Sequence, residues 1–158
     1  MDNIDRRILH CLRENARTSA SAIASRVSLS VPSVIDRIRK LEHDGVVRRY
    51  TALLDNSLIG RNLLAFISVG VDQPQSIDDL ERFARKTAGV VECYYVTGDL
   101  DFLLKVSVAD SSELEQIIRS LKHISGVSTT KTQVVLSTTK DESWINQEYI
   151  REPEAPPK

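Results

Sequence analysis

The chain has 158 residues, of which 41% are hydrophobic and 27% are charged, a composition typical of a soluble globular protein rather than a disordered one. No stretch approaches the roughly 20 apolar residues that a membrane helix needs. Residues 1–7 include acidic residues and lack an apolar segment, so we expect no signal peptide. Cys11 and Cys93 lie far apart, so we expect two reduced thiols in a cytoplasmic protein. Membrane proteins and disulfide-stabilised secreted proteins are therefore excluded.

The net charge of −1 hides an uneven distribution. Residues 1–52 hold ten Lys or Arg against six Asp or Glu, a net charge of +4, whereas the rest of the chain holds eleven against sixteen, a net charge of −5. A basic segment joined to an acidic one indicates that only the first part meets a polyanion, such as double-stranded DNA.

Hydrophobic periodicity predicts three helices in the first 45 residues. Each follows a residue whose side chain can cap a helix N-terminus: Asp2, Ser19 (or Thr18) and Ser30. Gly45 ends the third helix. The second and third helices, joined by a short break, predict a helix-turn-helix over about residues 19–44.

The face of the third helix opposite its apolar stripe is polar and partly basic. Hydroxyl side chains stand near its N-terminal end, the part of a recognition helix that meets base edges, and long cations follow one and two turns on. The residues expected to contact DNA, two of which follow the helix, are Ser30, Pro32, Ser33, Asp36, Arg37, Lys40, Arg48 and Arg49. The alternative is a solvated helix face, but the agreement of caps, stripes and charge favours DNA binding.

Residues 46–54 form a β-rich run interrupted by Arg48 and Arg49. Attached to a helix-turn-helix, this run predicts a wing whose arginines lie along the phosphate backbone. An exposed strand edge kept soluble by charge is the other interpretation, and the two are compatible.

From residue 63 the pattern changes to strands alternating with helices. Strands are predicted over residues 63–71, 90–97, 102–108 and 127–136, and Ser76 and Asp110 are predicted to cap the helices between them. The order βαββαβ is that of a ferredoxin-like fold. Two helices on one face of the sheet leave the other face bare, which favours a homodimer that pairs the sheets.

The predicted class is therefore α+β, a winged helix-turn-helix followed by a βαββαβ ferredoxin-like αβ sandwich. The predicted boundaries are 1–52 for the DNA-binding domain, 53–62 for the linker, 63–137 for the effector-binding and oligomerisation domain, and 138–158 for a C-terminal arm and tail. Within the last segment we expect residues 152–158 to be disordered, and Trp144, Tyr149 and Ile150 to pack as a short helix or arm.

Residues able to perform chemistry are scarce. His10, His43 and His123 are isolated in predicted helices, and no nucleophile elbow, phosphate-binding loop or dinucleotide fingerprint occurs. Asp99 and Asp101 form a carboxylate pair that turn formation explains. We therefore predict no catalytic residue, no metal and no cofactor.

Five stretches in order resemble the Lrp/AsnC transcription regulators, also called feast/famine regulators, over almost the whole chain. They fall within residues 4–9, 30–47, 50–52, 98–105 and 126–132. The resemblance implies a winged helix-turn-helix followed by an αβ sandwich that binds a small-molecule effector, typically an amino acid. It also implies homodimers that assemble into octamers or similar rings, and a regulator that acts in the cytoplasm on the nucleoid.

The effector is expected between subunits. Carried over position by position, the effector-binding residues are Gly98, Asp99, Leu100 and Asp101 in one turn, with Thr130, Thr132 and Gln133 from a neighbouring subunit. A carboxylate such as Asp101 suits the ammonium of an amino acid, while loop amides and threonine hydroxyls suit its carboxylate. Leu100 and Gln133 depart from the residues that many relatives carry there, so analogy does not identify the effector.

Two other functions are weighed against this one. Sirohaem decarboxylases resemble the family in fold, but they would need a histidine and basic residues at a pocket of the sandwich, which offers only His123. An architectural protein that wraps DNA would differ by its low ratio of specific to non-specific affinity.

Overall fold

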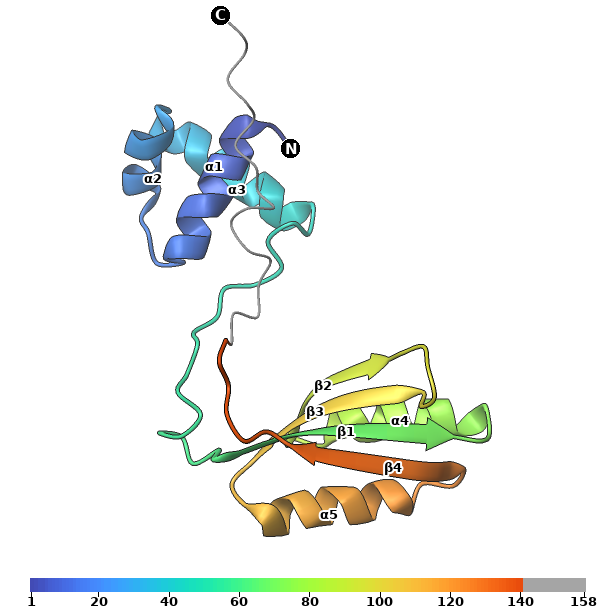
Figure 1. Ribbon diagram of the computed structural model, residues 1–158. Coiled ribbons are helices and arrows are strands. Elements are labelled where there is room, and N and C mark those ends of the chain that lie inside the picture. The colour runs from blue at the N-terminus through green and yellow to red at the C-terminus, as the bar shows by residue number, and fades with distance from the viewer. Residues whose placement is uncertain (141–158) are drawn as a thin grey trace, which may run out of the picture. The chain divides into compact units, whose positions relative to one another are not determined.

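A computed structural model describes residues 1–140, which divide into two compact units, residues 1–53 together with Lys140, and residues 54–139 (Figure 1). The predicted arm with Trp144, Tyr149 and Ile150, and the predicted tail over residues 152–158, lie outside the described residues.

The N-terminal unit consists of three helices. These are α1 (Asn3–Glu14), α2 (Ala20–Val27) and α3 (Val31–His43). Their N-caps are the predicted residues, because the side chains of Asp2, Ser19 and Ser30 accept hydrogen bonds from backbone N–H groups of the first turn. Gly45 follows α3 with a φ of +71°, as expected for a residue that ends a helix.

One apolar core holds these three helices together. Its buried residues come from all three helices: Ile8, Cys11, Ile23, Ala24, Val27, Val34 and Leu41. Because each helix contributes one stripe, the opposite faces remain available to solvent and to partners.

The strand predicted within residues 46–54 does not form. Residues 48–54 are exposed and have no regular secondary structure. The prediction was wrong for the single chain because a strand needs a neighbour for its backbone N–H and C=O groups, and among the described residues the only sheet is that of the C-terminal unit. The N-terminal unit is therefore a helix-turn-helix without a formed wing.

The C-terminal unit has the predicted βαββαβ order. Its elements are β1 (Leu63–Val71), α4 (Gln75–Lys86), β2 (Val90–Tyr95), β3 (Phe102–Val108), α5 (Ser111–Lys122) and β4 (Val127–Val134). The strands form one antiparallel sheet in the order β2-β3-β1-β4, which confirms the ferredoxin-like fold. Both β2 and β4 end two residues earlier than predicted.

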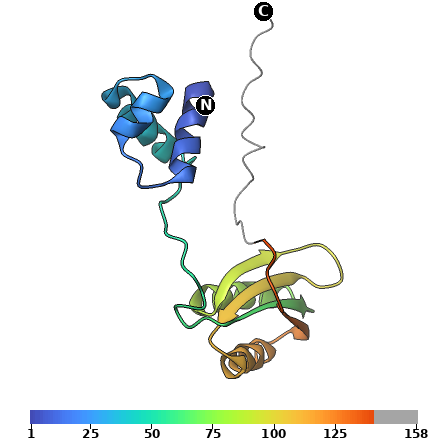
Figure 2. The same cartoon turned by 60° about the vertical axis from the view of Figure 1, so that its left-hand side comes forward.

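The core of this unit lies on one face of the sheet. Ala65, Ile67 and Val69 of β1 are completely buried in a cluster with residues of β3, α4 and α5, and Figure 2 shows α5 beneath the sheet. Successive side chains of a strand point to opposite faces, so Leu64 and Phe66 point to the other face, where they are half-buried. Within the described residues this second face has no helix packed on it.

Ser76 does not cap α4, contrary to the prediction. The helix begins at Gln75, and the buried Ser76 hydroxyl instead donates a hydrogen bond of 2.6 Å to the carbonyl oxygen of Ser125. A Cβ on Gly126 would lie 2.0 Å from this hydroxyl. The cap prediction failed because a tertiary partner, distant in sequence, takes the hydroxyl.

Candidate functional site

The outer face of α3 is the first candidate site. Asp36 and Arg39 are about three-quarters exposed and lie 3.8 Å apart, and Pro32 and Lys40 are also exposed. Arg39 is absent from the predicted set of DNA contacts although it lies on this face. Its spacing of three residues from Asp36 is the signal that identifies it.

The N-terminal end of α3 presents two hydroxyl groups. Ser30 Oγ accepts a hydrogen bond of 3.3 Å from the backbone N–H of Ser33, and the two hydroxyl oxygens lie 2.8 Å apart. The positive end of the helix dipole also lies at this end of α3, where it favours negatively charged groups. Ser30 and Ser33 are thus placed together, at the end of the helix where a phosphate or a base edge would be met.

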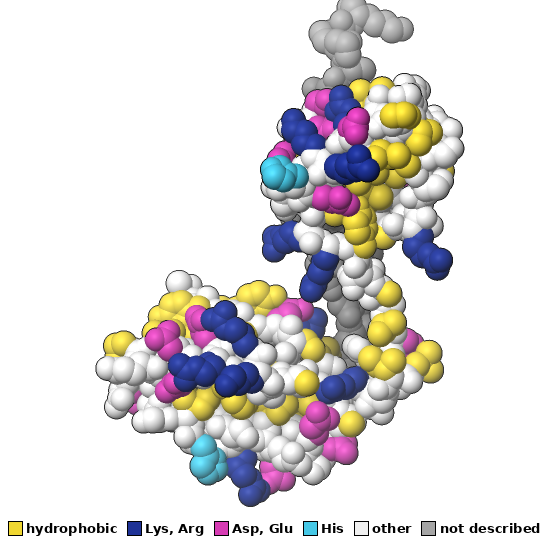
Figure 3. Space-filling view, turned by 180° about the vertical axis from the view of Figure 1, so that it is seen from behind, with side chains coloured by type: hydrophobic (Ala, Val, Ile, Leu, Met, Phe, Trp, Pro, Cys, Tyr) yellow, Lys and Arg dark blue, Asp and Glu magenta, His cyan; other side chains and the backbone are white. Residues whose placement is uncertain are grey.

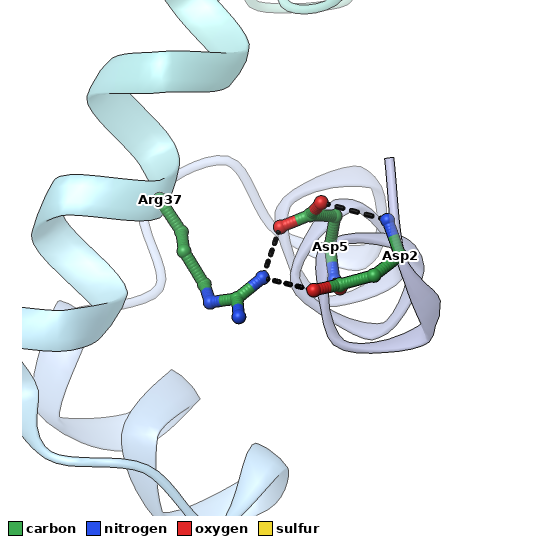
Figure 4. A network of polar contacts seen from close by, with 3 residues as sticks. All are labelled: Asp2, Asp5 and Arg37. Carbon is green, nitrogen blue, oxygen red and sulfur yellow. Dashed lines mark hydrogen bonds and ion pairs between the residues drawn. The ribbon is translucent and has the colours of Figure 1, made fainter.

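The Arg37 side chain forms ion pairs with two acidic residues of the N-terminal unit (Figure 4). Its Nη1 donates to Asp2 Oδ2 at 2.6 Å and to Asp5 Oδ1 at 2.7 Å. These hydrogen bonds raise the pKa of the Arg37 guanidinium. The backbone N–H of Asp5 and then the Arg37 side chain lower the pKa of the Asp2 carboxyl. The Arg37 side chain thus joins α3 to the start of α1, a contact that the sequence prediction of Arg37 as a DNA-binding residue did not include.

Arg48 and Arg49 are exposed in the irregular segment that follows α3. The next residue, Tyr50, donates a hydrogen bond of 2.8 Å from its hydroxyl to Glu42 Oε1. Partial burial and the Glu42 carboxylate raise the pKa of the Tyr50 phenol to about 12. The two arginines are therefore held near the C-terminal end of α3 by the residue that follows them.

Basic and acidic side chains stand next to one another on the surface of the N-terminal unit (Figure 3). Besides Arg37, Arg26 is paired with Glu14 at 2.6 Å. The bases of this unit are consequently not equivalent, because some are neutralised by neighbours within the unit.

The turn over residues 98–101 is the second candidate site. Asp101 Oδ2 accepts a hydrogen bond of 2.8 Å from the backbone N–H of Val71, and the backbone N–H of Asp101 donates to the Val69 carbonyl at 3.0 Å. Gly98 has a φ of +129°, which favours glycine. Because a carboxylate has acceptor capacity for about four hydrogen bonds, Asp101 can hold this turn and still accept from a ligand.

Leu100 connects this turn with the start of β4. It lies with Ser128 and Thr129 around Gly70 of β1, and the Ser128 hydroxyl donates to the Gly70 carbonyl at 3.3 Å. Sequence reasoning missed Gly70, Ser128 and Thr129. A glycine within an apolar strand, which often marks a close approach of another segment, is the signal that identifies Gly70.

The predicted residues of β4 do not share one face of the sheet. Thr130 and Thr132 pair with Val69 and Ile67, whose side chains point toward the helices, whereas Gln133 pairs with Phe66 and points the other way. A pocket that uses all three would have to wrap around β4, which is an edge strand.

A shallow open groove of about 440 Å³ lies between α4 and β2, and Glu81, Arg85, Cys93 and Tyr95 belong to its lining. It includes none of the predicted effector residues. Burial, followed by the nearby Glu81, raises the pKa of the Cys93 thiol.

Other kinds of site find little support in residues 1–140. No group of three His, Cys, Asp or Glu side chains there could hold a metal ion, and no helix there has the length and apolarity to cross a membrane. His123 follows α5, and its Nδ1 lies 2.6 Å from the Arg119 carbonyl oxygen.

Two family models match the chain. The AsnC-type helix-turn-helix domain matches residues 1–42, and the Lrp/AsnC ligand binding domain matches residues 64–145. The leucine-responsive regulatory protein of Escherichia coli K12 is 34% identical over 143 residues, which cover 89% of this chain and 87% of that protein.

Solved structures of transcription regulators are also similar to this chain. A transcriptional regulator of Neisseria meningitidis in complex with L-Met has a TM-score of 0.88 at 29% identity, covering 96% of this chain and 99% of that one. The leucine response regulatory protein of Mycobacterium tuberculosis has a TM-score of 0.78 at 30% identity, covering 89% and 96%. The helix-turn-helix, the ferredoxin-like sandwich and these matches together show that the chain belongs to the Lrp/AsnC family of transcription regulators.

Proposed function

We propose that the protein is a sequence-specific DNA-binding regulator of transcription, and that it contacts DNA with the outer face of α3. The observation that carries this proposal is the exposed face with Arg39 and Lys40 on the second helix of a helix-turn-helix. The exposed Arg48 and Arg49 are assigned to contacts with the phosphate backbone. Such contacts position a protein on DNA without reading the DNA sequence.

The protein is proposed to act as a homodimer that pairs the sheets of its C-terminal units. The second face of the sheet carries half-buried apolar side chains, including Leu64, Phe66 and Leu103, and pairing two such faces would remove them from water. Twofold symmetry then presents two α3 helices, so operators should be near-palindromes with half-sites about one turn, ~10 bp, or a multiple of it apart. Further assembly into an octamer or a similar ring belongs to the same proposal.

An amino acid is the proposed effector. Among the relatives, one is named for its response to leucine and one was solved with L-Met. In this chain, Asp101 supplies a carboxylate for the ammonium group, and the turn from Gly98 supplies backbone amides for the carboxylate. The site of action is proposed to be the nucleoid in the cytoplasm.

Fluorescence anisotropy of a labelled duplex tests the function. The duplex comes from upstream of the gene that encodes the chain, its control is a scrambled duplex, and both are titrated at two salt concentrations. Preference for the first duplex supports a specific regulator, and repeating the titration with each amino acid identifies the effector. Equal, steeply salt-dependent binding to both would indicate an architectural protein, and binding to neither would contradict DNA binding.

A further inference from the structure

We infer that Arg37 is a positioning residue, which fixes α3 against the start of α1 and leaves the contacts with DNA to its neighbours on the helix. This inference rests on the proposed function, since it concerns how α3 is aimed at the DNA.

The contacts of Arg37 form a closed network with the capping box of α1 (Figure 4). Asp2 Oδ1 accepts from the backbone N–H of Asp5 at 2.8 Å, and Asp5 Oδ2 accepts from the backbone N–H of Asp2 at 2.9 Å. The remaining oxygen of each carboxylate accepts from Arg37 Nη1. Each acid thus uses one oxygen to begin α1 and the other to hold α3.

The place of Arg37 on α3 leads to the same conclusion. Val34 stands three residues before it and Leu41 four residues after it, and both are buried in the core. Residues at these spacings are neighbours on a helix surface, so Arg37 leaves α3 at the border between its buried stripe and its outer face. Its side chain is 32% exposed, compared with 74% for Arg39 on the outer face.

Electrostatics oppose a move of Arg37 to a phosphate. Such a move would break two charge-assisted hydrogen bonds, which are among the stronger ones in proteins. It would also leave Asp2 and Asp5 facing each other without a cation, and the Asp5 side chain is only 16% exposed. The network of Arg37, Asp2 and Asp5 has two acids and one base, a net charge of −1, so it does not itself supply positive charge for DNA.

A positioning role predicts a particular pattern of defects. The orientation of a recognition helix decides which base edges its side chains reach, whereas the number of phosphate contacts sets the salt dependence of binding. Loss of the network should therefore reduce discrimination between sequences and leave the salt dependence unchanged.

The experiment compares four single variants with the wild type. Asp2→Asn and Asp5→Asn remove the charges but keep acceptors for the capping hydrogen bonds, Arg37→Gln removes the cation, and Lys40→Gln is the control on the outer face. Binding is measured by anisotropy over a range of salt concentrations, well below each variant's Tm. The probes are a duplex that the wild type selects from a random library and a scrambled duplex.

For Arg37→Gln and Asp5→Asn we expect no change in the salt slope, which is the slope of log affinity against log salt concentration. The ratio of specific to non-specific affinity should fall about tenfold, which is comparable to the effect of a mismatched base pair. Lys40→Gln should lower the salt slope by about one unit. Because Asp5→Asn removes a negative charge and releases Arg37 from one partner, a salt slope that rises by about one unit would show that Arg37 then contacts a phosphate and would overturn the inference.

Two further results would overturn it. A slope that falls by one unit in Arg37→Gln would make Arg37 a phosphate contact, and an unchanged specificity ratio in every variant of the network would limit its role to stability. Failure of the wild type itself to select any duplex is a different outcome, because it contradicts the proposed function before any variant is compared.

Discussion

Leu100 lies directly over Gly70. A methyl carbon of Leu100 is 3.1 Å from the position that a Cβ on Gly70 would take. Because Gly70 has no side chain, the turn over residues 98–101 can close against the sheet at this point of β1. Through this contact, the candidate effector site and β1 form one packed structure.

Substitution of Gly70 with Ala should make this packing measurable. The added methyl group crowds Leu100 and should lower the free energy of unfolding by about 1 kcal/mol, as overpacking commonly does. Adding Leu100→Ala should relieve the crowding, so a double-mutant cycle followed by chemical denaturation should give a coupling energy of at least ~0.5 kcal/mol. Strictly additive effects would show that the two residues do not press on each other.

Asp101→Asn separates the two roles of this residue. An amide oxygen can still accept from the backbone N–H of Val71, so the fold and DNA binding should persist. The negative charge that suits an amino-acid ammonium is lost, so the response of DNA binding to the effector should disappear. Anisotropy titrations with and without the effector measure this, and an undiminished response would remove Asp101 from the site.

Arg48→Ala tests the segment after α3. If Arg48 contacts one phosphate, its loss should weaken binding about equally on all sequences and reduce the salt slope by about one unit. Titrations on the selected and scrambled duplexes supply both quantities. An effect confined to particular base positions would instead make Arg48 a reader of sequence.

The contribution of Asp2 to stability should depend on pH. Its pKa in the folded chain lies below the ordinary value of 3.8 because the Asp5 N–H and Arg37 favour the charged form. A lowered pKa stabilises the fold above the ordinary value, and this stabilisation is lost as the pH falls through the lowered one. The Tm of the wild type should therefore exceed that of Asp2→Asn at neutral pH, and the gap should close in strong acid. A gap that stays constant down to pH 2 would contradict the assignment.

Features set by local sequence could be predicted. The caps at Asp2, Ser19 and Ser30, and the apolar runs of β1 and β3, depend on neighbours a few positions away. The opposite orientations of Thr130 and Gln133 follow from the alternation of side chains along any strand, so the sequence contained that information too.

What could not be predicted depends on partners far along the chain. The hydroxyl of Ser76 is taken by a carbonyl 49 residues away, and Arg37 by acids 32 and 35 residues away. Residues 46–54 have strand-forming side chains but find no partner strand among residues 1–140. In each case the residue type was informative, and its spatial neighbour decided its role.

Photo-cross-linking tests most directly the central claim that the outer face of α3 meets DNA. A photoreactive amino acid is placed at Asp36 on α3 in one variant and, as a control, at the exposed Arg82 on α4 in another. Irradiation with the selected duplex should cross-link the variant at position 36 and leave the variant at position 82 free. Equal cross-linking from both positions, or none from position 36 under conditions where the variant binds the duplex, would contradict the claim.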